Sequence, residues 1–176
     1  MRLLHFADLH LGIENYGRID PKTGLHSRLA DFAASFRFVV DLAISERVDA
    51  VLFAGDAYKT PNPSPTWQRE FAAQIHRLDE ASIPLVLTVG NHDTPASFGR
   101  ATSVDIFSAL KVGNTHVIRT PRLFELETAS GPLQIAGLPW PPRHFLRADE
   151  HYRECDSSTL TERTQEMCSR QISEFA

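Results

Sequence analysis

Acidic, amide and imidazole side chains gather at three places in this sequence, each directly after a short apolar run. The candidate donors are Asp8, His10, Asp56, Asn91, His92 and Asp93. Oxygen and imidazole donors without a thiol are the ligand chemistry of a hard or borderline divalent metal. One such residue after a strand is more typical of a turn or a helix cap. Three such groups in this order predict a metal site.

The apolar runs that precede these donors are typical of buried strands. Residues 50–54 (AVLFA) have the pattern of a strand buried on both faces, and Gly55 then lets the chain turn tightly before Asp56. Residues 3–12 and 85–95 repeat this design. A carboxylate at such a strand end lies where open α/β sheets bind their ligands. Because Asp56 follows the middle strand, we expect it to reach both flanking loops and to bridge two ions.

Helices are expected between these strands. Apolar residues recur at helical spacing over residues 28–46, where Ser27 is the expected N-cap. Ser64 and Pro65 fit an N-cap and a first helical position, and Trp67 then lies on the core face of a second helix. The alternation of strands and helices predicts an α/β fold with parallel strands joined by right-handed crossovers.

The pattern changes after the third donor group. Three short strand-like runs, residues 115–119, 123–127 and 133–136, are separated by turn residues and predict an antiparallel extension of the sheet. Near the end of the chain, Thr159 with Glu162 three residues later forms a capping-box signature. This signature predicts the start of a final helix.

Composition and charge restrict the class of protein. With 176 residues and 42% hydrophobic content, the chain is long enough for one sizeable core. A net charge of −4 and a pI near 6.0 argue against a protein that holds DNA by bulk positive charge alone. With no signal peptide and no membrane-spanning apolar run, we expect a cytoplasmic protein without membrane association. Cys155 and Cys168 are expected to be free thiols far from the donor group.

The donor groups also carry a resemblance to a known family. The order D-x-H, G-D-x-x and G-N-H-D resembles the calcineurin-like metallophosphoesterase superfamily. Finer features resemble its DNA-repair nuclease branch, the SbcD and Mre-eleven family. These features are ADLHLG at 7–12, AGDAY at 54–58 followed by PNPSP, and GNHD at 90–93 followed by Ser103 and Val104.

This resemblance spans roughly residues 1–140 and implies a fold. The fold is a metallophosphoesterase-type α/β sandwich, in which parallel strand-helix units are followed by antiparallel strands. Residues 1–176 are then expected to be the N-terminal part of the catalytic domain, truncated at the C-terminus. The capping and ATPase-binding regions are expected to be absent.

The resemblance further implies a two-ion site. It assigns Asp8, His10 and Asp56 to one ion, and Asp56 with Asn91 to the second. Mn²⁺ is the expected metal, and the histidine ligand is also compatible with Fe²⁺ or Zn²⁺. Members of the family carry further ligand histidines later in the chain, which have no counterpart here. We therefore expect the second site to be incomplete.

A separate role follows for His92. It is the candidate proton donor to the leaving group, or a stabiliser of the transition state, with Asp93 orienting its ring. The alternative is that His92 only bonds to the backbone of its loop.

The implied activity is hydrolysis of phosphodiester bonds in DNA, by hydroxide attack at a two-metal site. The chain resembles an exonuclease and endonuclease subunit of double-strand break repair, which works with an SbcC-type (Rad-fifty-like) ATPase and commonly forms a homodimer. We expect the 176-residue chain alone to be weakly active or inactive. Two alternatives stay open: a general metallophosphoesterase acting on nucleotides or phosphoproteins, and an inactive scaffold or dimerisation fragment.

Overall fold

A parallel β-sheet is the central element of the computed structural model, which describes residues 1–22, 24–96, 99–141 and 156–176. The sheet has four strands in the order β1-β2-β3-β4, and every neighbouring pair is parallel. The strands are β1 (Leu3–Phe6), β2 (Ala50–Phe53), β3 (Leu85–Thr88) and β4 (Thr115–Ile118). The predicted α/β fold with parallel strand-helix units is therefore confirmed.

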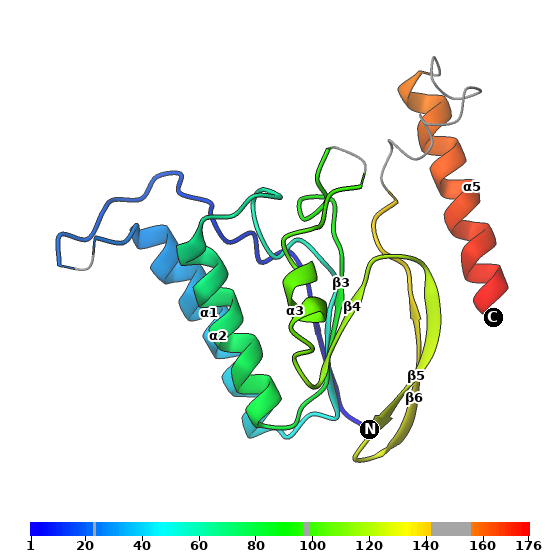
Figure 1. Ribbon diagram of the computed structural model, residues 1–176, viewed down its shortest axis with the longest axis horizontal. Coiled ribbons are helices and arrows are strands. Elements are labelled where there is room, and N and C mark those ends of the chain that lie inside the picture. Colours follow the sequence, from blue (N-terminus) through cyan, green and yellow to red (C-terminus); the bar gives the residue numbers. More distant parts are fainter. Residues whose placement is uncertain (23, 97–98, 142–155) are drawn as a thin grey trace.

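Helices cover one face of this sheet (Figure 1). They are α1 (Ser27–Ser45), α2 (Pro65–Glu80) and the short α3 (Asp105–Ala109). Phe71 of α2 is fully buried at the centre of this layer, where its ring stacks on Phe36 of α1 at 5.3 Å between centroids. The rings of Phe53 and Phe107 lie 5.9 Å and 5.7 Å from the Phe71 ring, so one aromatic side chain joins both long helices to the sheet.

An antiparallel hairpin covers the other face (Figure 1). It consists of β5 (Arg122–Thr128) and β6 (Gly131–Gly137), and Leu126 packs there against Val86 and Ile118 of the sheet. Helix α5 (Ser157–Phe175) lies beyond the hairpin and buries Leu160. Together these layers form the expected α/β sandwich. Among the described residues, none of the helices is long and apolar enough to cross a bilayer.

The sequence-based assignment of the later strands is partly wrong. Residues 123–127 and 133–136 do pair in antiparallel fashion, but as a two-stranded sheet of their own. The run at 115–119 contains β4, which pairs parallel to β3 in the main sheet, with Leu85 opposite Thr115. The reason is the connection: the chain returns through α3, and a helical crossover brings the next strand in parallel.

Two predicted helix caps are also wrong. His26, not Ser27, is the N-cap of α1, and its Nδ1 accepts a hydrogen bond from the Arg28 N–H at 3.3 Å. The Ser27 hydroxyl instead accepts from the Arg18 N–H in the preceding loop. At α5 the Asp156 carboxylate accepts from the Thr159 N–H at 2.8 Å, so this helix begins before the predicted capping box.

We predict that Phe71→Ala lowers the free energy of unfolding by about 3–5 kcal/mol, because it leaves a cavity between both helices and the sheet. Urea unfolding followed by circular dichroism measures this change. Phe38→Ala is the matched control, since Phe38 lies on α1 with 68% of its surface exposed. An equal loss in both variants would contradict the central role of Phe71.

Candidate metal centre

Three strand ends bring the candidate donors together, because β1, β2 and β3 are parallel and end at the same edge of the sheet. The loops after β1 and β2 remain hydrogen-bonded beyond the strands. The Asp8 N–H donates to the Gly55 carbonyl at 3.1 Å, and the His10 N–H donates to the Asp56 carbonyl at 3.0 Å. These backbone hydrogen bonds therefore fix the Cα positions of Asp8, His10 and Asp56.

Three of the candidate donor residues adopt an uncommon backbone conformation. The φ angles of Asp8, His10 and Asp56 are 58°, 46° and 62°, which is the left-handed region. Residues with a Cβ enter this region at a cost in free energy, and such strain gathers at functional sites. The surrounding hydrogen bonds hold these three side chains in positions that a regular strand would not give them.

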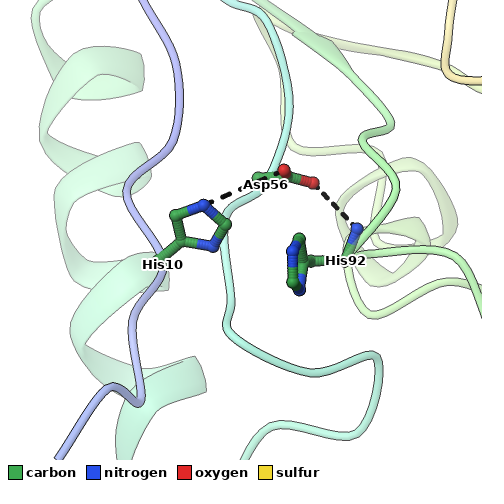
Figure 2. A group of neighbouring side chains, drawn as sticks. All are labelled: His10, Asp56 and His92. Atoms are coloured by element: carbon green, nitrogen blue, oxygen red, sulfur yellow. Dashed lines mark hydrogen bonds and ion pairs between the residues drawn. The ribbon is translucent and has the colours of Figure 1, made fainter. Parts of the chain in front are cut away.

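The side chains of His10, Asp56 and His92 form the centre of the cluster (Figure 2). Nε2 of His10 lies 3.3 Å from Oδ1 of Asp8 and 3.9 Å from Oδ2 of Asp56. The His92 ring stands edge-on to the His10 ring, with 4.7 Å between centroids. His10, Asp56 and His92 each offer a ligand atom, and these atoms lie within 4.8 Å of one another.

The geometry of this group fits a divalent metal. Bonds of about 2.0–2.2 Å from imidazole nitrogen or carboxylate oxygen place donors on opposite sides of an ion roughly 4 Å apart. In the described part of the chain, Nδ1 of His10 is buried without a hydrogen-bond partner. The other ring nitrogen, Nε2, faces the carboxylates of Asp8 and Asp56, as an imidazole ligand would.

Asp93 connects the loops after β2 and β3. Its side chain is fully buried, and its Oδ2 accepts from the Asp56 N–H at 2.8 Å and the Gly90 N–H at 3.0 Å. Its Oδ1 accepts from the N–H groups of Ala57 and Tyr58 at 3.0 Å and 3.4 Å. Burial raises the pKa of the Asp93 carboxyl, whereas the backbone N–H groups act to lower it. The pKa of Asp93 is raised overall, while the four N–H donors on its two oxygens stabilise the ionised form.

The expectation that Asp93 orients the His92 ring is therefore wrong. Both Asp93 oxygens are directed at backbone N–H groups, and Nδ1 of His92 lies 3.0 Å from the Lys59 carbonyl oxygen. The backbone N–H of His92 donates to Oδ1 of Asp56 at 2.9 Å. Sequence reasoning missed the Lys59 contact because a backbone carbonyl leaves no signal in residue types.

A close approach of two glycines sets the distance between these loops. A Cβ on Gly55 would lie 2.7 Å from the Gly90 Cα, and a Cβ on Gly90 would lie 2.1 Å from Oδ1 of Asp56. Gly55 also has a φ of 98°, which favours glycine. Glycine at both positions lets the carboxylate of Asp56 lie close to the loop after β3, which carries Asn91, His92 and Asp93.

Asp8, Asp56 and Asn91 line one groove, with a volume of about 410 Å³. The structure thus brings all four predicted ligand residues to one place, with His10 between the Asp8 and Asp56 carboxylates. Trp140 and Cys168 of α5 also line this groove. The prediction that Cys168 lies far from the donors is wrong, because Cys168 lines the same groove as Asp8, Asp56 and Asn91. Cys168 is a free thiol as predicted, and Cys155 lies outside the described residues.

We predict that Asp93→Asn lowers the free energy of unfolding by about 3 kcal/mol. The substitution replaces one carboxylate oxygen by an amide nitrogen, so two backbone N–H groups lose their acceptor. Thermal and urea unfolding measure the effect. Asp31→Asn, on the exposed surface of α1, is the matched control. If both variants unfold alike, the Asp93 hydrogen bonds do not hold the loops together.

Comparison with known proteins agrees with this geometry. A DNA double-strand break repair protein Mre11 from Aeropyrum pernix is 38% identical over 95 residues, or 54% of this chain and 22% of that protein. The SbcD subunit of the nuclease SbcCD from Bacillus subtilis is 30% identical over 146 residues, or 80% of this chain and 34% of that protein. The chain thus spans about a fifth to a third of the length of these relatives. The sequence profile of the calcineurin-like phosphoesterases matches residues 1–156, and the chain therefore belongs to that family.

Proposed function

We propose that this chain forms the metal site of a phosphodiesterase that cleaves DNA, as an exonuclease and endonuclease subunit. The observation that carries the proposal is the convergence of His10, Asp56 and His92 within 4.8 Å at the ends of three parallel strands. The relatives support DNA as the substrate, since their names describe break repair and a nuclease subunit.

The proposed metals are two divalent ions, with Mn²⁺ preferred. Asp8, His10 and Asp56 serve the first ion, and Asp56 with Asn91 serves the second. Mixed imidazole and oxygen donors suit a borderline ion better than Mg²⁺, which prefers oxygen ligands and retained waters. Two bound ions supply Lewis-acid stabilisation of the negative charge that develops on a transferring phosphoryl group. The second ion has fewer ligands here, so we expect the 176-residue chain alone to be weakly active.

His92 is the proposed proton donor to the leaving oxygen. Its Nδ1 is directed at the Lys59 carbonyl, which accepts a hydrogen bond and so fixes the proton on that nitrogen. Its other ring nitrogen is then the one that can transfer a proton. The ring also lies against His10, close enough to act as a ligand instead, and the two roles differ in their effect on metal affinity.

The remaining proposals concern the setting of the reaction. A subunit role suggests an SbcC-type (Rad-fifty-like) ATPase as partner, because the Bacillus subtilis relative is named as one subunit of a nuclease complex. We also propose that the protein forms a homodimer and that it acts in the cytoplasm, where the DNA lies. Residues 1–176 are proposed to be the N-terminal part of the catalytic domain.

We predict that His92→Ala lowers Mn²⁺-dependent hydrolysis by about 10²–10⁴-fold while Mn²⁺ binding is retained, because only proton transfer is lost. The measurement is release of label from an end-labelled DNA duplex, by the 176-residue chain and by the complete product of its gene. Titration calorimetry of Mn²⁺ binding accompanies it. His76→Ala, an exposed histidine of α2 near Glu80, is the matched control.

Three other results would change the assignment. Loss of Mn²⁺ binding in His92→Ala would make this residue a ligand. Hydrolysis of a small phosphodiester without cleavage of DNA would move the function to a general phosphoesterase. If the complete gene product neither binds Mn²⁺ nor hydrolyses either substrate, the chain is a scaffold or dimerisation fragment.

A further inference from the structure

An apolar compartment adjoins the donor groove. Its volume is about 220 Å³, and its walls include Pro121, Met167 and Gln171. The compartment and the groove share residues 138–141 and Cys168 as a common border. One continuous depression therefore has an acidic, metal-binding end and an apolar end.

Trp140 stands at this border, and its backbone is anchored. Its backbone N–H donates to the Val89 carbonyl at 3.0 Å, next to the loop that carries Asn91. Prolines at 139 and 141 limit the backbone on both sides. Its side chain nevertheless remains 49% exposed, and Met167 across the compartment is 40% exposed. An exposed indole on an anchored backbone beside the donor groove is well suited to contact a flat ligand.

The other tryptophan of the chain is different. The ring of Trp67 packs on Gly12, where an added Cβ would lie only 2.5 Å from a ring carbon, and it contacts the core. Its role is the core packing that the helical pattern predicts. Trp140, in contrast, is exposed beside the donor groove.

We propose that the apolar compartment is a nucleobase subsite, in which Trp140 stacks on a base of a strand whose phosphate lies over Asp8, Asp56 and Asn91. Every nucleobase has a flat π-face, so stacking tolerates any sequence. A phosphoprotein offers a flat ring only where its sequence happens to supply one, whereas every nucleotide carries a base beside its phosphate. The subsite therefore favours nucleic acid over phosphoprotein, and it rests on the proposed function.

The test compares two fluorescent oligonucleotides of equal length, one of thymidine and one of abasic sugars, both with cleavage-resistant phosphorothioate linkages. Their binding to the 176-residue chain is measured in Mn²⁺ by fluorescence anisotropy. We expect Trp140→Ala to weaken binding of the thymidine strand by about 10-fold and to leave the abasic strand unchanged. Trp140→Phe should keep most of the affinity because it keeps an aromatic face.

Ile172→Ala is the matched control, since Ile172 is an exposed apolar residue of the same helix as Met167 and does not line the compartment. Equal affinity of Trp140→Ala and the unchanged chain for the thymidine strand would overturn the subsite, as would an equal loss for both strands or no binding of either strand. Hydrolysis of end-labelled DNA by the complete product of the gene, with and without Trp140→Ala, separates the two proposals. Cleavage that is independent of Trp140 leaves the nuclease standing without the base subsite.

Discussion

The carboxylate of Asp93 is the interaction on which the site depends. It accepts backbone N–H groups from both the Asp56 loop and the Gly90 loop, so two separate strand ends are tied through one buried side chain. The Gly55–Gly90 approach is possible only because neither residue has a side chain. A charge buried at this depth is favourable only when its oxygens are fully hydrogen-bonded, and the four N–H donors provide this. Polar contacts within the protein thus hold the donor set in place.

The sheet, the strained loops and the groove act as one arrangement. Parallel strands bring three loops to one edge, and left-handed backbone at Asp8, His10 and Asp56 aims the side chains inward. The same edge receives residues 138–141 through the Trp140–Val89 hydrogen bond. The proposed metal site and the proposed base subsite therefore both depend on the loop directly after β3, which carries Val89 and Asn91.

Sequence reasoning predicted which side chains meet at the sheet edge because they follow apolar strands, and because the alternation of strands and helices predicts parallel strands. It did not reach the role of Asp93, since a carboxylate that accepts backbone N–H groups looks like any other acidic residue in a loop. It assigned β4 to an antiparallel extension because this strand is the first of three short runs separated by turn residues, a pattern typical of antiparallel strands. It placed Cys168 far from the donors because the return of α5 to the groove depends on tertiary packing that has no local pattern.

The measurement that tests the metal centre most directly is calorimetric titration of Mn²⁺ into this chain and into its Asp56→Asn variant. Asp56 lies within reach of His10 and is held by the His92 N–H, so it is the carboxylate shared by the whole donor set. We predict that the unchanged chain binds Mn²⁺ and that Asp56→Asn binds it at least about 10-fold more weakly while remaining folded. Equal Mn²⁺ affinity in the two proteins would contradict a metal centre at this sheet edge.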